Sequence, residues 1–265
     1  MVTVKQYELA RKRYIGIMED NQKRSYGGNQ EWFSKEEGSL KDRITHEYGC
    51  GVIAITDLFL YWAMTLEEGK ETFAAGFIND ANQITKENYM ELVRKIRDEY
   101  AFIFGKAGTF GIQLAEAINE YVKDNHLNFK ASLITRLSDL EMLHKIQNML
   151  KHNKPIILMI GQSSPVILSR LQKKGLPFYK QNKTIDILAR NKKKSYASYR
   201  VSRKNVYGHF VTITGVIIDE QAEIASQNIM LRISSWGQEY YVSYHQLRFY
   251  IKHISKPYLS AIISF

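Results

Sequence analysis

The sequence predicts an α+β protein in which helices come first and an antiparallel β-sheet follows. Apolar residues recur at helical spacing through most of the first 152 residues. From Lys154 onward the pattern changes to short β-branched runs that pair like hairpins, with Gly237 at one turn. Helices and strands in separate stretches of chain are typical of the α+β class.

One domain accounts for the whole chain. It has 265 residues, 45% of them hydrophobic, which is enough for one core, and no stretch has the composition of a linker. We therefore expect a single domain over 1–265, with a helical part over about 1–152 and a sheet part over about 153–265. Residues 163–207 form an insertion between two strands.

Amphipathic spacing predicts a helix over residues 4–18, and an almost wholly apolar run predicts a buried helix over 52–64. Three further helices are predicted to begin at Thr85, Thr109 and Ser138. Thr85 and Ser138 are expected N-caps, and Glu141 completes a capping box with Ser138. These three helices form a helical insertion between the buried helix and the sheet. Strands are predicted over 154–161, 208–218, 228–237, 239–244 and the last eight residues.

The positive charge is concentrated in one segment. The chain has a net charge of +10, yet residues 170–204 alone hold twelve Lys or Arg and a single acid, Asp186. Such a run is usually a solvated loop. The alternative is that it attracts an acidic substrate, RNA or an anionic membrane. Tyr179, Tyr196 and Tyr199 interleave with the basic residues, but we do not expect a nucleic-acid partner.

The single cysteine, Cys50, allows no internal disulfide, which suits a reducing compartment. The N-terminal segment is charged and lacks the apolar core of a signal peptide, and no apolar run is long enough to span a membrane. These features predict a cytoplasmic protein without a membrane span, with secretion by a route that needs no signal peptide as the open alternative.

Three polar residues stand in an order that suits thiol catalysis. Cys50, between Gly49 and Gly51, opens the buried helix, and His209 opens a predicted strand. The run "SSWG", Ser234 to Gly237, ends the next strand. A helix N-terminus and an imidazolium both favour a thiolate, an imidazole moves the proton, and a third polar group fixes its tautomer.

This layout resembles the papain-like cysteine peptidase superfamily, and among its branches the compact bacterial C39-like peptidases. Three stretches carry the resemblance: "GCGVIA" at 49–54, "KIQNMLKHNKPIILMIG" at 145–161 with "GHFVTITGV" at 208–216, and "ISSWGQEYYVSYHQL" at 233–247. The last is similar to the Asn-Ser-Trp-Gly signature of papain-type enzymes. The resemblance implies a papain-like fold, with a central Cys-bearing helix packed on an antiparallel sheet.

Carried over to this chain, the resemblance implies that Cys50 is the nucleophile and His209 the general base. Ser234 falls on the position of the orienting asparagine, which is a departure because its hydroxyl is uncharged. The expected substrate is a peptide or amide, possibly acidic, attacked through a thioester intermediate. Gly49, Gly51 and Trp236 are expected to line the cleft.

The oxyanion hole shows a second departure, because the family places a glutamine six residues before the cysteine and Ile44 stands there. The backbone N–H of Cys50 remains as one donor. For the side-chain donor we favour Gln30 over His46, because the surrounding "GGNQEWF" suits a fixed turn beneath the cysteine helix.

Two further interpretations of these residues stay open. In the first, Cys50 is a small buried residue of the core. In the second, which the two departures favour, the chain is a catalytically inactive papain-like scaffold that binds a peptide or an acidic partner. The other histidines have no metal-ligand spacing with Cys, Asp or Glu, so we expect neither a metal nor a cofactor. The sequence does not fix the oligomeric state.

Overall fold

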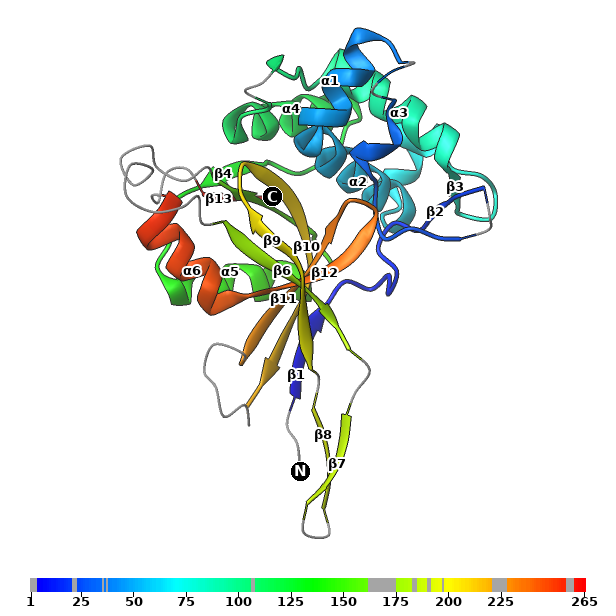
Figure 1. Ribbon diagram of the computed structural model, residues 1–265. Helices are drawn as coiled ribbons and strands as arrows, with labels where there is room; N and C mark the ends of the chain where they lie inside the picture. The colour runs from blue at the N-terminus through cyan, green and yellow to red at the C-terminus, as the bar shows by residue number, and fades with distance from the viewer. Residues whose placement is uncertain are drawn as a thin grey trace.

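The computed structural model describes residues 4–20, 23–34, 36, 38–105, 108–161, 175–182, 185–189, 192–196, 198–220, 228–255 and 260–265. Within them, one group of helices lies beside a large antiparallel sheet, against which further helices pack (Figure 1). The predicted α+β class with an antiparallel sheet is confirmed.

The α-helices among the described residues are α1 (Leu40–Tyr48), α2 (Cys50–Thr65), α3 (Lys86–Glu99), α4 (Gly111–Asp124), α5 (Asp139–Lys151) and α6 (Tyr244–Tyr250). Short 3-10 helices cover Gln30–Trp32, Glu68–Glu71 and Phe73–Phe77, and a π-helical turn covers Ile251–Ser255. Helices α2 to α5 confirm four predicted helices, including the helical insertion. Thr85 Oγ1 accepts from the backbone of Asn88, and Ser138 and Glu141 form both bonds of the capping box.

The main sheet contains nine of the described strands. Eight follow the order β4 (Ser132–Ile134), β13 (Ala261–Ser264), β5 (Ile156–Ile160), β10 (His209–Asp219), β11 (Ile229–Ser235), β12 (Gln238–Ser243), β6 (Leu176–Gln181) and β9 (Tyr199–Val206), and β1 (Val4–Glu8) also pairs with β10. Two small pairs lie outside it: β2 (Ile17–Met18) with β3 (Ile84–Thr85), and β7 (Ile185–Ala189) with β8 (Lys192–Tyr196). The strands predicted after residue 153 are confirmed.

Strand β10 is the central element of the sheet because three strands pair with it. Its first half pairs with β5, so that His209 lies opposite Ile160, and its second half pairs with β1. Strand β11 runs along the other edge, with an irregularity in the register between Ile213 and Gly215. The strand that carries His209 is therefore held from both sides.

The helix predicted over residues 4–18 is wrong. The chain there forms β1, whose residues pair with Gly215–Asp219 of β10, and Arg232 of β11 forms an ion pair with Glu8 at 2.8 Å. Tyr14 then adopts a left-handed backbone with φ 50°, which a continuous helix excludes. Backbone hydrogen bonds to a distant strand thus outweigh the local amphipathic pattern.

Most of the basic insertion that the structure describes is β-strand. Strands β6 and β9 extend the main sheet beyond β12, while β7 and β8 form a separate hairpin. Residues 163–174 lie outside the described residues. Tyr179 donates to Gln246 at 2.8 Å and the Tyr199 ring contacts that of Tyr241, so neither ring stands out as a stacking surface.

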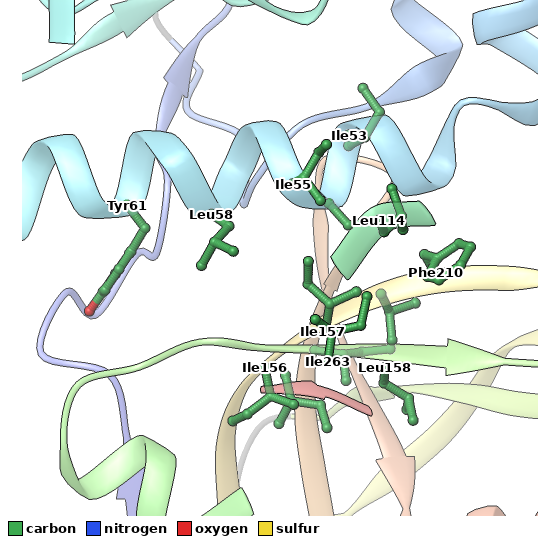
Figure 2. Packing of buried hydrophobic residues seen from close by; sticks show 14 of the residues in the cluster. Ile53, Ile55, Leu58, Tyr61, Leu114, Ile156, Ile157, Leu158, Phe210 and Ile263 are labelled. Atoms are coloured by element: carbon green, nitrogen blue, oxygen red, sulfur yellow. The ribbon is translucent and has the colours of Figure 1, made fainter. Parts of the chain in front are cut away.

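Helix α2 is buried on every side from Gly51 to Met64, as its apolar run predicts. Figure 2 shows Leu58 and Tyr61 on the side of α2 that faces the sheet, with Ile156, Ile157 and Ile263 opposite. This packing fixes the start of α2 relative to the sheet and so places Cys50.

Replacing Ser138 by Ala removes the N-cap of α5 and half of its capping box. We expect the free energy of unfolding to fall by about 1 kcal/mol. Urea denaturation followed by circular dichroism measures the change. The matched control is Glu116→Ala, an exposed position in the middle of α4, which we expect to change the value by less than about 0.5 kcal/mol. Equal effects of the two variants would contradict the capping assignment.

Candidate active site

Cys50 is placed by a sharp junction between two helices. Gly49 ends α1 and precedes α2 directly, and the two helices are bent by 86° at this point. Cys50 is therefore the first residue of α2, where the N–H groups have no acceptor within the helix. As a whole residue Cys50 is partly exposed, unlike the residues that follow it, whereas its thiol is buried.

His209 is the first residue of β10, and its ring is enclosed by aromatic and polar neighbours. The Trp236 ring stacks on it with centroids 4.1 Å apart and planes 9° apart. The guanidinium carbon of Arg203 lies 4.1 Å from the centroid of the Trp236 ring, so tryptophan stands next to both a cation and the imidazole. Nε2 of His209 forms a 2.8 Å hydrogen bond with Ser235 Oγ.

Cys50 and His209 both line one small cavity of about 20 Å³. Gln30, Ser234, Ser235 and Trp236 also line it. The fold thus gathers most of the predicted site residues around the same space, although they come from four separate parts of the chain. That volume is about the size of one water molecule.

The hydrogen-bond partner of His209 is Ser235, and the prediction that Ser234 orients the imidazole is wrong. Successive side chains of a strand point to opposite faces, so adjacent serines of β11 cannot both face the ring. Ser234 Oγ donates instead to the carbonyl of Tyr26 at 2.8 Å. Ser234 still lines the cavity, on the side of the Tyr26–Gly28 segment.

Gln30 lies at the cavity, whereas His46 is not among the residues that line it. The Gln30 Nε2 donates to the carbonyl of His46 at 2.8 Å, and the His46 ring contacts the Phe33 carbonyl. Asn29 caps the short helix Gln30–Trp32 by accepting from Glu31. Helix α1 therefore anchors Gln30 through a backbone carbonyl of His46.

The two glycines beside Cys50 are not among the residues that line this small cavity, so their place in the wall of a substrate cleft stays a prediction. At Gly51 a Cβ would lie 3.0 Å from Leu114 and 3.1 Å from Thr109, and at Gly49 it would collide with the backbone of Thr45. These positions permit close packing of the chain against itself. Trp236 does line the cavity, as predicted.

Burial keeps the cysteine and histidine neutral. Burial raises the pKa of the Cys50 thiol, although hydrogen bonds from backbone N–H groups, that of Phe210 first, act against it. Burial lowers the pKa of His209 to about 3, and the positive charge of Arg203 acts in the same direction. The site therefore favours a thiol beside a neutral imidazole, where the sequence suggested a thiolate beside an imidazolium.

Asp57, which the sequence analysis missed, also lines the cavity. Its carboxylate accepts from the backbone N–H of Gly28 at 3.0 Å and from the Tyr89 hydroxyl at 2.8 Å. Burial raises its pKa to about 7, while these hydrogen bonds act against the rise. The available signal was that Asp57 is the single charged residue in the apolar run 52–64.

Trp236 reaches His209 from a two-residue hairpin turn. Ser235 pairs with Gln238, and the intervening Trp236 and Gly237 have φ of 47° and 67°. Positive φ at both positions is the geometry of a type I′ turn. Gly237 donates to the Gly28 carbonyl and accepts from Tyr26, so the turn is tied to the segment that leads to Gln30.

Comparison with protein-family models, with curated proteins and with solved structures finds no match to this chain. No single helix in the described ranges is long and apolar enough to cross a membrane; α1 and α2 together pass on length and composition, as a bent pair. Among the same residues, no three or more His, Cys, Asp or Glu gather to hold a metal ion.

The two buried titratable groups give opposite pH dependence to stability. The pKa of Asp57 rises from 3.8 to about 7 on folding, so its contribution is full below about pH 4 and is lost as pH rises through 7. The pKa of His209 falls from 6.5 to about 3, so its contribution is present above pH 6.5 and is lost on acidification. Between about pH 4 and 6.5 the two offset each other.

Single variants should separate these contributions. In Asp57→Asn only the His209 contribution remains, so the free energy of unfolding should rise with pH between 4 and 6.5. His209→Gln should show the reverse, a fall as pH increases. Each change amounts to at most roughly 4 kcal/mol over the window. Urea denaturation at pH 4.5, 5.5 and 6.5 measures both, with the wild type as reference, and parallel curves for the two variants would rule out this assignment.

Proposed function

We propose that the protein is a thiol-dependent hydrolase or acyl-transfer enzyme that acts on peptide or amide bonds with papain-like chemistry. One observation carries the proposal: Cys50 and His209, 159 positions apart in the chain, line the same cavity. One starts a helix and the other starts a strand, which gives both a rigid base. Trp236 stacked on the imidazole and Gln30 beside the cavity add to the support.

In this proposal the neutral imidazole of His209 acts as the general base, although its lowered pKa makes it a weaker base than a free imidazole. With Nε2 protonated and donating to Ser235, Nδ1 carries the lone pair that accepts the thiol proton as Cys50 Sγ bonds to the substrate carbonyl carbon. The imidazolium then donates that proton to the departing amine as the C–N bond breaks, which leaves a thioester on Cys50. Water completes hydrolysis, whereas an amine completes acyl transfer.

The negative charge on the carbonyl oxygen needs hydrogen-bond donors in this scheme. The backbone N–H of Cys50 is one, because it belongs to the first turn of α2. Gln30 Nε2 is the second, since one of its protons is used by the His46 carbonyl and it has another to give. The small cavity is about the size of the oxygen that these donors would hold.

A second candidate function is a scaffold that binds a peptide or an acidic partner without turnover. The observations that favour it are the uncharged hydrogen-bond partner of His209, the raised pKa of Cys50 and the narrow cavity. Basic residues on β9, among them Arg200 and Arg203, would supply the charge for an acidic partner.

The thiol itself provides the test, since every thiol adduct of this chain is an adduct of Cys50. We expect a peptidyl electrophile to label the native protein and Cys50→Ala to lower turnover of a fluorogenic peptide mixture roughly a thousandfold or more. Intact mass spectrometry and fluorescence measure the two effects. Iodoacetamide labelling should accelerate up to and beyond pH 9, because burial raises the thiol pKa. Labelling without turnover that depends on Cys50 would favour the scaffold.

Adjacent serines offer a matched pair of variants for the orienting role. Ser235→Ala removes a hydrogen bond worth about 1 kcal/mol, so we expect the acylation rate to fall about five- to tenfold. Ser234→Ala leaves the His209 contact in place and should change the rate less than twofold. Stopped-flow measurement of the first turnover gives both rates. A larger loss in Ser234→Ala would restore the assignment based on family resemblance.

A further inference from the structure

Four large apolar side chains are exposed together at the start of α4 and in the loop before it. Phe102, Phe104, Phe110 and Ile112 have 62%, 57%, 53% and 61% of their surface exposed. We call these four residues the aromatic rim. Large apolar side chains clustered on a surface mark an interaction site more often than scattered ones do.

The rim is held by a frame of hydrogen bonds. Gln113 of α4 donates to the Phe102 carbonyl at 2.9 Å and accepts from the Phe110 backbone at 3.4 Å. Phe104 donates to the Gly108 carbonyl at 2.9 Å, and its ring centroid lies 6.0 Å from that of Phe110. These bonds hold the backbone of Phe102, Phe104 and Phe110, and the rings of Phe104 and Phe110 lie near each other.

The frame joins the candidate active site at the start of α2. Thr109 and Leu114, on either side of Phe110 and Ile112, pack against Gly51, the residue after Cys50. Figure 2 shows Leu114 of α4 near Ile53 of α2 and Phe210 of β10. The segment that carries the rim thus packs against the start of α2, next to Cys50.

The sheet order places the rim and Trp236 on opposite sides of the His209 strand. Gly111 packs so closely against β5 that a Cβ would lie 3.0 Å from Met159 Sδ, and Met159 is the β5 partner of Phe210. Trp236 follows β11, which lies along the other edge of β10. A chain laid across Cys50 and His209 would meet Trp236 on one side and the rim on the other.

We propose that the aromatic rim is the subsite for a large apolar side chain of the peptide substrate, next to the bond that Cys50 attacks. The inference rests on the proposed function, which supplies a substrate chain at this position. The segment that carries the rim packs against Gly51 through Thr109 and Leu114, so the occupant that we argue for is a side chain of the substrate bound at Cys50. Binding of a second copy of this chain is an outcome of the test below.

The experiment compares the alkylation rate of Cys50 by two blocked chloromethyl ketones, one of phenylalanine and one of glycine, with iodoacetamide as a probe without a side chain. We expect the wild type to react at least tenfold faster with the phenylalanine reagent. The double variant Phe104→Ala, Phe110→Ala should lose at least fivefold of this preference and keep its iodoacetamide rate within twofold. Phe249→Ala is the matched control, since Phe249 is 55% exposed on α6, away from the cavity.

The outcomes separate the two proposals. If the ketones react but show no preference, or if the preference survives in the double variant, the rim proposal is overturned while the proposed function stands. If Cys50 resists all three reagents in the native protein, the proposed function fails and the rim proposal falls with it. Analytical ultracentrifugation of both proteins completes the test, because a dimer lost in the double variant would assign the rim to a second copy.

Discussion

The packing of α2 against the main sheet, at strand β10, is the interaction on which the rest of the structure depends. Because the helix is buried on every side after Cys50, its position and direction are set by the core and not by the site. The strand is fixed equally firmly, since β5 and β1 hold one edge and β11 the other. Helix α2 and strand β10 both begin at the same cavity, and they place Cys50 and His209 in its lining.

Local patterns were enough to predict most of the elements. Capping signals at Thr85 and Ser138 and the β-branched run of β10 are written in neighbouring residues, and the structure follows them. The start of the chain could not be read in this way, because β1 exists only through its pairing with Gly215–Asp219. A period-2 segment and an amphipathic helix can share a short sequence, and distant hydrogen bonds decide between them.

For the candidate site, the sequence predicted most of the residues that line the cavity, but it did not predict their hydrogen-bond partners. Chain order alone pointed to Cys50 and His209, whereas choosing between Ser234 and Ser235 required the face of β11 on which each side chain lies. The charge state of His209 was harder still to predict, because burial of its imidazole and the nearby charge of Arg203 both arise from the folded structure. Asp57 shows the same limit: its carboxylate matters because Gly28 and Tyr89 surround it.

The hairpin turn at Trp236 sets the stability of the fold against the stacking of Trp236 on His209. A type I′ turn is best served by asparagine or glycine at the position that Trp236 occupies, and a bulky residue with positive φ is strained there. The strained turn places the Trp236 ring over the imidazole of His209 and covers one face of it. Replacement of Trp236 by asparagine would relax the turn and leave the His209 ring uncovered. Selection for thermal stability alone would therefore remove the stacked tryptophan, which distinguishes this cavity from an ordinary core.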